Sequence, residues 1–180
     1  MSFIFEATEL KGLIKITPQA FPDDRGVFWE SYRRSEFVEH GITAAFVQDN
    51  VSISTKGVLR GLHFQKEPHA QGKLVSVIRG TVLDVVVDVR PESPTRGRYL
   101  KFELTGDGGT SLYVPPGFAH GFVVLSDEVI FTYKVTADYC PTAEDGILWN
   151  DETLDIDWQI DDPIISEKDA ILPPYAEVTG

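Results

Sequence analysis

The sequence predicts an all-β fold, a β-sandwich or barrel built from roughly nine or ten short strands and one short helix. Apolar and polar residues alternate over short segments, turn residues recur every ~8–12 positions, and no long segment has helical periodicity. A chain of 180 residues can bury a core without disulfides. We therefore expect a single domain spanning residues 1–180.

The first half of the chain contains several strand signals and the one clear helix signal. Strands are expected over residues 13–16, 27–32 and 46–54. A helix is expected over residues 35–41, where Ser35 is a candidate N-cap and Gly41 stands where a helix would stop.

The strand at residues 46–54 has a polar centre, formed by Gln48, Asp49 and Asn50. Amide and carboxylate groups in this position either bind the edges of a sugar or base, or mark a β-bulge at the edge of a sheet. From this strand alone, the bulge is the favoured interpretation.

Basic residues interrupt two apolar strand signals in the segment from Lys56 to Gly80. Arg60 and His63 lie in the first strand and Lys73 begins the second. Such residues either extend to solvent or line a pocket. Because Arg60 and His63 are three positions apart, a regular strand would direct them to opposite faces. If both reach one pocket, an irregularity is required, and we expect it at Gly61.

The segment Thr81–Val89 alternates strictly, and Asp84 and Asp88 share one face of it with valines. Carboxylates on an apolar face predict at least one half-buried acid with a basic partner. Further strands are expected over residues 99–104, 112–114 and 129–135, and His120 enters a strand that follows a Pro-Gly turn.

Charge and composition exclude several classes of function. The formal net charge of −12 and the sequence pI of about 4.6 argue against a nucleic-acid partner. A local basic pocket for an anionic small molecule remains compatible with this charge. The single cysteine, Cys140, forms neither an internal disulfide nor a cysteine zinc site. Because no apolar run is long enough to span a membrane and the N-terminus lacks signal-peptide features, we expect a cytoplasmic protein with no membrane partner.

Several motifs, taken together and in order, resemble those of one enzyme family. They are FPDDRGVFWE (21–30), FVQDN (46–50), RGLHFQ (60–65), QGKLVSVIRG (71–80), TVLDVVVDVR (81–90), PPGFAHGF (115–122), FTYKVTADYCP (131–141), GILWND (146–151) and ISEKD (165–169). Over roughly residues 8–170 the chain resembles the dTDP-4-dehydrorhamnose 3,5-epimerases, which are cupin-like jelly-roll isomerases.

The resemblance implies inversion of C3 and C5 in dTDP-4-dehydro-6-deoxy-D-glucose, giving dTDP-4-dehydro-L-rhamnose for dTDP-L-rhamnose biosynthesis. It also implies a homodimer that uses no metal or organic cofactor. Both carbons are α to the C4 ketone, so their protons become acidic when the enolate is stabilised. The enzyme must then supply a base on one face of the sugar, an acid on the other, and positive charge or hydrogen bonds at the ketone oxygen.

Four residues carry the chemistry that the resemblance implies. His63 is the candidate base, Asp169 orients and charges it, Lys73 stabilises the enolate, and Tyr133 returns a proton from the opposite face. Without the resemblance, these would be an ordinary strand histidine, a solvated tail acid, a surface lysine and a core tyrosine.

The resemblance also implies binding roles. Arg25, Arg60 and Lys168 resemble contacts to the diphosphate and nucleotide, and Tyr139 resembles the aromatic that stacks on thymine. The other implied substrate contacts are Glu30, Gln48, Asp49, Asn50, Lys73, His120 and Glu144.

Three alternatives remain open at this point. A metal-dependent cupin needs about three histidines and a carboxylate around one metal, but only His63 and His120 can converge here. A non-catalytic sugar-binding module would need no acid opposite a base. Within the family, an epimerase acting at C3 or C5 alone is the nearest alternative, and the presence of Tyr133 favours the double reaction.

Overall fold

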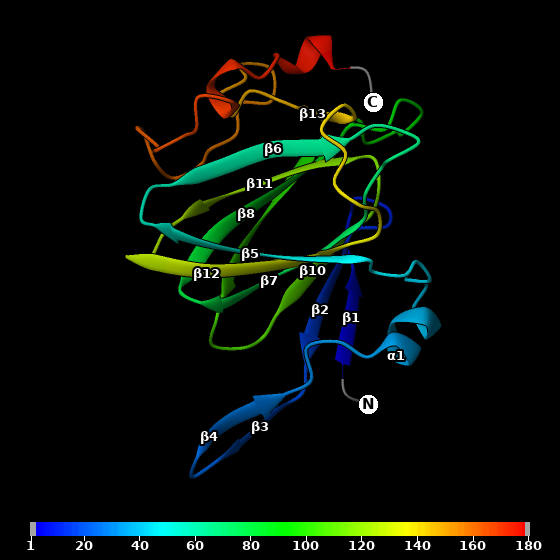
Figure 1. Cartoon of the computed structure of the whole chain (residues 1–180), viewed down its shortest axis with the longest axis vertical. Coiled ribbons are helices and arrows are strands. Elements are labelled where there is room, and N and C mark those ends of the chain that lie inside the picture. The colour runs from blue at the N-terminus through cyan, green and yellow to red at the C-terminus, as the bar shows by residue number, and fades with distance from the viewer. Residues whose placement is uncertain (1–2, 179–180) are drawn as a thin grey trace.

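The computed structural model describes residues 3–178, and within them the protein is nearly all β, as predicted. Two antiparallel sheets face each other in a jelly-roll arrangement (Figure 1). The first sheet contains, in spatial order, β1 (Phe3–Ala7), β2 (Ile14–Pro18), β10 (Ser111–Val114), β7 (Lys73–Arg79), β12 (Glu128–Val135) and β5 (Gln48–Thr55). The second contains β13 (Glu144–Gly146), β6 (Leu59–Gln65), β11 (Phe118–Val124), β8 (Thr81–Asp88) and β9 (Tyr99–Thr105). The predicted domain of residues 1–180 begins and ends with two residues that lie outside the described part of the chain.

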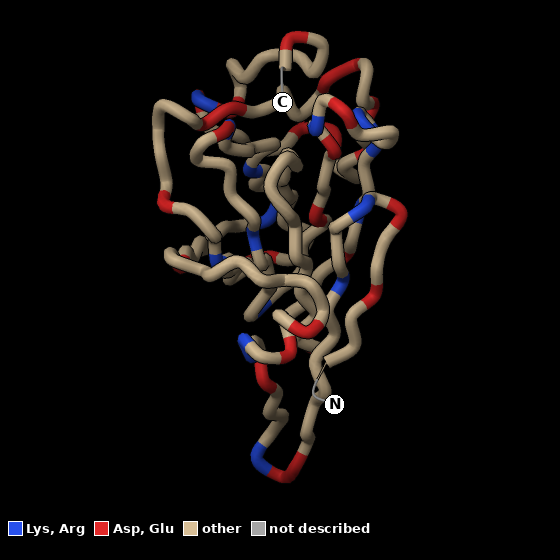
Figure 2. The backbone as a smooth tube through the Cα atoms, turned by 90° about the vertical axis from the view of Figure 1, so that its right-hand side faces the viewer, with Lys and Arg blue, Asp and Glu red and all other residues tan. Residues whose placement is uncertain are grey.

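The remaining elements are short. They are the hairpin of β3 (Ala20–Asp23) and β4 (Gly26–Trp29), the helix α1 (Arg34–Glu39), and the 3₁₀ turns η1 (Asp169–Ile171) and η2 (Tyr175–Glu177). The hairpin projects away from the two sheets, and Figure 2 shows acidic and basic residues together at its tip. No helix in residues 3–178 is both long enough and apolar enough to cross a membrane.

The core between the two sheets is built from the inward face of each strand. Val75, Val86, Phe122 and Phe131 are among its buried members. Burying one such side chain stabilises the fold by roughly 1.5–3 kcal/mol. The sheets are therefore held together mainly by apolar packing, and the polar groups described below lie at one end of this core.

The five-stranded sheet is also covered on its outer face, which explains the valine-rich sequence of β8. Val82 and Val86 point into the core between the sheets, whereas Val85 and Val87 pack under the C-terminal segment that includes Trp158. In Figure 1 this C-terminal segment lies above β6 and covers the outer face of the five-stranded sheet. A strand buried on both faces reads as a nearly continuous apolar run.

Both aspartates of β8 are fully buried, which confirms the predicted buried acid with a basic partner. Asp84 Oδ2 lies 2.8 Å from His120 Nε2, and Asp88 Oδ2 lies 2.7 Å from Arg90 Nη2. The two carboxylates share one face of the strand, but their partners lie in different parts of the molecule.

The helix α1 is present but begins one residue before the predicted range. Its N-cap is Arg33, which makes no side-chain capping bond, so the prediction of a Ser35 cap was wrong. Packing positions the helix instead, because Phe37 is buried against Ile16 and Tyr113 on the outer side of the six-stranded sheet.

The polar centre of β5 forms no bulge, so the interpretation favoured from that strand alone was wrong. β5 is an edge strand, but its pairing with β12 runs without a break from Gln48 to Thr55. The regular alternation directs Gln48 and Asn50 toward the interior and Asp49 outward.

Three strands were not predicted from the sequence. They are β1, β3 and β13. β3 is fully exposed and contains Pro22, so its composition indicates a turn rather than a strand. β13 is three residues long and forms only by pairing with β6.

The predicted irregularity at Gly61 is confirmed. The register between β6 and β11 shifts between His120 and Phe122, and Gly61 has a φ of +122°. A Cβ at this position would lie 2.6 Å from Gly121 Cα and 2.8 Å from the His120 carbonyl oxygen. Only glycine fits both the backbone conformation and this close approach of two strands.

We predict that Gly61→Ala lowers the free energy of unfolding by about 3 kcal/mol or more, because backbone strain and steric overlap add. Gly41→Ala is the matched control, since Gly41 also has a positive φ (+88°) but no atom lies within 4 Å of its added Cβ. This control should lose only about 1 kcal/mol. Urea unfolding measures the free energy of unfolding of both variants. Equal losses would show that the close approach of the strands at Gly61 does not add to the cost of the substitution.

Candidate active site

A cavity of about 470 Å³ opens at one end of the core, between β6 and β11 of one sheet and β5, β7 and β12 of the other. This volume suits a small-molecule ligand. Its polar lining combines basic, acidic, amide and phenolic groups. The lining residues are Gln48, Asn50, Ser52, Arg60, His63, Gln71, Lys73, His120, Phe122, Phe131, Tyr133, Tyr139, Glu144, Ser166, Lys168 and Asp169.

His63 and Asp169 form a hydrogen-bonded pair although 106 residues separate them in the sequence. His63 Nε2 lies 2.7 Å from Asp169 Oδ1, and the other carboxylate oxygen accepts a bond from the Gly61 backbone N–H at 3.2 Å. Burial alone would raise the pKa of Asp169, but the bonds from His63 and Gly61 hold it below its ordinary value. The ionised carboxylate has no proton to donate, so Nε2 carries the hydrogen and Nδ1 of a neutral His63 is free to accept a proton.

Lys73 lies at the start of β7 and is almost entirely buried, with 8% of its surface exposed. Its Nζ donates to the His63 carbonyl oxygen at 3.1 Å, which places the ammonium beside the candidate base. Burial lowers the pKa of Lys73 from 10.5 to about 8, while the negative charges of Asp84 and Glu144 oppose this shift. The charged form is therefore available near neutral pH and is easily lost above it.

Tyr133 comes from β12, in the sheet opposite His63, and is half-buried in the wall of the cavity. Burial raises the pKa of its phenol above the ordinary value of 10.0, only partly countered by the charge of Arg60. The hydroxyl therefore stays protonated over the physiological range and can serve as a proton donor.

A polar cluster forms part of the cavity lining where the chain leaves β12 and approaches η1. Glu144 Oε2 accepts bonds from the Tyr139 hydroxyl and from Lys168 Nζ, both at 2.5 Å. The Tyr139 backbone N–H donates to Gln48 Oε1 at 3.0 Å. The bond to Glu144 raises the pKa of Tyr139 and that of Lys168. The Tyr139 ring and the Lys168 ammonium are thus held together through Glu144 on this side of the cavity.

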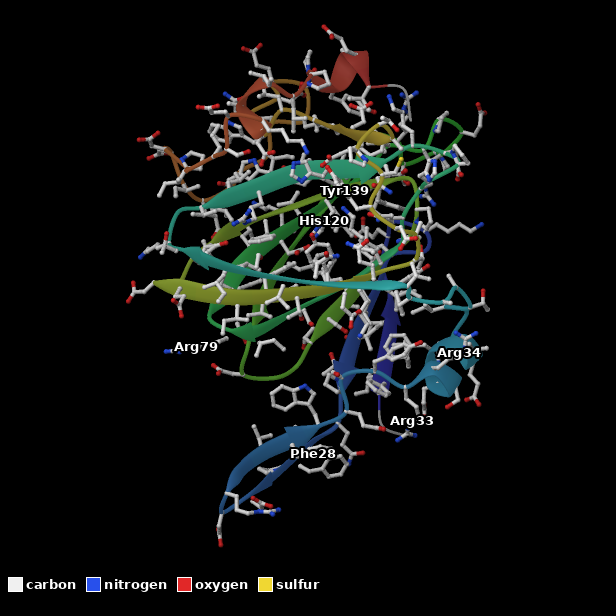
Figure 3. The ribbon with its side chains drawn as sticks, viewed as in Figure 1. Phe28, Arg33, Arg34, Arg79, His120 and Tyr139 are labelled. Atoms are coloured by element: carbon white, nitrogen blue, oxygen red, sulfur yellow. The ribbon has the colours of Figure 1, made fainter. Side chains whose placement is uncertain are left out.

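His120 lies deep in the cavity, directly across the strand pair from His63. Figure 3 shows it between the two sheets, below Tyr139. Its ring stacks 6.2 Å from that of Phe131, and its Nε2 is bonded to the buried Asp84.

All but three of the residues predicted for the site line this cavity. Arg25 lies at the tip of the β3–β4 hairpin, where its guanidinium pairs with Asp23 at 2.5 Å. Glu30 follows that hairpin and pairs with Arg33. Asp49 points out of the barrel to Lys134 at 2.8 Å, because it alternates with its neighbours along β5.

Several residues that shape the site were not predicted from the sequence. Gln65 is buried, and its side-chain amide bonds the backbone of His69, Asp138 and Cys140, which fixes the loop that carries Tyr139. The only sequence signal was an amide side chain inside an apolar strand. The remaining unpredicted lining residues are Ser52, Gln71, Phe122, Phe131 and Ser166.

Within residues 3–178, no cluster of three or more His, Cys, Asp or Glu side chains is arranged to hold a metal ion. The prediction of a cofactor-free site stays a prediction. What the described residues do provide is an imidazole, an ammonium group and a phenol around one cavity.

The fold and this cavity define a jelly-roll protein with a polar cavity of the size of a small-molecule site. A sequence profile described as dTDP-4-dehydrorhamnose 3,5-epimerase matches residues 7–177. The chain belongs to the dTDP-4-dehydrorhamnose 3,5-epimerase family, whose members are isomerases.

Individual relatives agree with this assignment. The dTDP-4-dehydrorhamnose 3,5-epimerase of Methanothermobacter thermautotrophicus is 48% identical over 97% of this chain and 96% of its own. The crystal structure of the enzyme from Elizabethkingia anophelis superimposes with a TM-score of 0.95 over 100% of both chains, at 45% identity. The 3,5-epimerase of Legionella pneumophila, solved in complex with dTDP-4-keto-L-rhamnose, gives a TM-score of 0.94 at 43% identity over 98% of this chain and 94% of its own.

We predict that kcat/KM falls as Lys73 loses its proton, reaching about one tenth of its plateau by pH 9, because burial lowers the pKa of Lys73 to about 8 in the free protein. Lys73→Arg should shift this fall upward by at least about two pH units, since a guanidinium stays charged. Lys134→Arg, on the outward face of β12, serves as the control and should keep the wild-type profile. The pH dependence of kcat/KM measures this, and an unshifted fall in Lys73→Arg would remove Lys73 as its source.

Proposed function

We propose that this protein inverts C3 and C5 of dTDP-4-dehydro-6-deoxy-D-glucose through enolate intermediates, with the residues of the cavity in the roles that follow. The observation that carries the proposal is the position of His63 and Tyr133 on facing sheets, across one cavity. Inversion at a carbon next to a ketone needs a base on one side of the sugar and an acid on the other.

His63 removes the proton. Its Nδ1 lone pair takes the hydrogen from C3 or C5, and the electron pair of the broken C–H bond moves into the carbonyl to form the enolate. The imidazolium that results is stabilised by Asp169, whose carboxylate lies 2.7 Å from Nε2. The bond to Gly61 holds Asp169 in place, so the base is oriented before substrate binds.

Lys73 and Tyr133 complete the reaction. The Lys73 ammonium, held beside His63, stabilises the negative charge on the enolate oxygen. Tyr133 then donates its phenolic proton to the carbon from the face opposite His63, which inverts the centre. Tyr133 regains a proton from solvent and His63 releases one, so the enzyme returns to its starting state.

The outer part of the cavity is assigned to the nucleotide. Arg60 and Lys168 supply cations for the diphosphate, and the exposed ring of Tyr139 supplies a stacking surface for the base. Gln48 and Asn50 bring amide groups to the same cavity from β5.

An acid facing a base across the cavity favours an enzyme over a binding module, which has no need of this arrangement. A mono-epimerase would use it at one carbon only. Both C3 and C5 lie one bond from the same carbonyl, so one base and one acid serve both once the sugar turns between the two steps.

We further propose that the protein acts as a homodimer, in which the β3–β4 hairpin of one protomer reaches the cavity of its partner. Phe28 on this hairpin is 67% exposed, and Figure 3 shows it far from His120 and Tyr139. Val51 and Ile53 are exposed on the outer face of β5 and offer an apolar docking surface. Such docking would bring Arg25, whose side chain is 90% exposed, to a second copy's substrate.

The whole chain is proposed to act as one domain, because both sheets share one core and the C-terminal segment supplies Asp169 to it. A cytoplasmic location is proposed as well, since the dTDP-sugar substrate of such an enzyme is a product of intracellular metabolism. No nucleic-acid or membrane partner is proposed for this acidic chain.

The test of the proposed reaction is proton NMR of the enzyme with dTDP-4-dehydro-6-deoxy-D-glucose in D₂O. Wild-type protein should place deuterium at both C3 and C5 with inverted configuration. His63→Asn should reduce exchange at both carbons by at least about 100-fold, because the base is lost, while dTDP binding persists. His69→Asn, in the β6–β7 turn, is the control and should behave as wild type. Exchange at one carbon alone would identify a mono-epimerase, and none in the wild type would leave a binding module.

We predict that inactive Arg25→Ala and His63→Asn proteins recover activity when mixed. In a mixed dimer, one cavity combines an intact His63 with an intact hairpin from the partner, so random pairing restores about a quarter of wild-type activity. Activity after subunit exchange measures this. A mixture that stays as inactive as its components would place Arg25 outside the partner's site.

A further inference from the structure

We propose that Asp84 is a positioning residue for this reaction. It holds the His120 ring so that Nε2–H points to the Asp84 carboxylate and Nδ1 points into the cavity. There Nδ1 accepts a hydrogen bond from a hydroxyl of the sugar. This inference rests on the proposed function and assigns Asp84 a part in it. Asp84 itself touches no substrate and acts through His120.

The pairing of β6 with β11 inside the five-stranded sheet places two histidine–carboxylate pairs side by side. His63 and His120 are register partners on β6 and β11, so both rings point to the same face. His63 is held by Asp169 at 2.7 Å and His120 by Asp84 at 2.8 Å, in each case through Nε2. Both histidines line the cavity.

The bond to Asp84 fixes the orientation of the His120 ring. A carboxylate can only accept, so Nε2 carries the hydrogen, and in the neutral ring Nδ1 then carries the lone pair. Within residues 3–178, Nδ1 of His120 takes part in no hydrogen bond, although the ring as a whole lines the cavity. An acceptor in this position matches a sugar hydroxyl.

Stability alone does not account for Asp84. Its side chain is completely buried, and its Oδ1 has no hydrogen-bond partner among the described residues. A half-satisfied buried carboxylate reduces stability relative to an apolar residue of similar size. Its surroundings are apolar, since Val82, Val86 and Phe122 belong to the same core cluster. A polar group retained under these conditions points to a role in the adjacent site.

The Asp84 carboxylate also acts on Lys73, which lines the same cavity. Burial lowers the pKa of Lys73, and the negative charge of Asp84 opposes this shift. Asp84 therefore interacts with two groups of the cavity lining, His120 and Lys73.

The experiment uses ¹⁵N-histidine-labelled protein and needs no turnover in its first part. The chain has four histidines, and His120→Asn identifies the His120 signals. We expect Nε2 of His120 to be protonated and Nδ1 to be unprotonated. The ¹⁵N chemical shift of His120 Nδ1 should change when a dTDP-hexose without a keto group is added, and it should not change when dTDP alone is added. The proposal would be overturned if Nδ1 is protonated and Nε2 is not, or if the sugar leaves the Nδ1 chemical shift unchanged.

The second part compares Asp84→Asn with Asp88→Asn. Asp88 is equally buried on the same face of β8, but its partners are Arg90, Ser93 and Thr95. Asp84→Asn should lower kcat/KM by about 10- to 100-fold, in the range that loss of one positioned group gives, while the Kd for dTDP stays within about twofold. Asp88→Asn should keep wild-type kcat/KM.

Wild-type kcat/KM in Asp84→Asn, or an equal loss in Asp88→Asn, would overturn the role of Asp84. If the wild-type protein fails to exchange deuterium, the proposed reaction fails, and the NMR of His120 still decides whether Asp84 orients that ring. The two failures are thus distinguished.

Discussion

The irregular pairing of β6 with β11 at Gly61 is the constraint on which the rest of the site depends. A regular strand would direct Arg60 and His63 to opposite faces. The register shift at Gly61 brings both to the cavity, and the freed Gly61 N–H becomes a donor to Asp169. One backbone feature therefore sets the position of the proposed base, of its carboxylate partner and of a cation in the same cavity.

The same pairing ties the C-terminal segment to the active site. Asp169 reaches the cavity because residues after β13 cross the outer face of the five-stranded sheet and pack there through Leu154 and Trp158. Burial of apolar side chains in this cover supplies the stability, while the His63–Asp169 pair at its end carries the proposed chemistry. Loss of packing in the cover should therefore affect activity as well as stability, because Asp169 depends on it.

The sequence predicted the fold class because its signals are local. Alternation and turn residues identify strands such as β8, and the glycine between Arg60 and His63 indicated the irregularity. The sequence could not predict β13, which is defined only by its partner, or the absence of a bulge in β5, which depends on continuous pairing with β12. Local composition carries no information about such partners.

The site was predictable only in part, for the same physical reason. Roles for His63, Tyr133 and Asp169 followed from a resemblance over many motifs, and the structure brings these residues to one cavity. Asp49 was included with its neighbours, but strand alternation turns it outward. Arg25 lies at the tip of a hairpin that projects away from the cavity, and no pattern in the sequence specifies that direction.

The central claim is that His63 and Tyr133 act on opposite faces of one sugar. The most direct measurement is NMR of Tyr133→Phe with the dTDP-4-keto sugar in D₂O. The variant keeps its base, so deuterium should still enter with the starting configuration retained, while inversion falls by more than about 100-fold. Inversion at the wild-type rate in this variant would contradict the account.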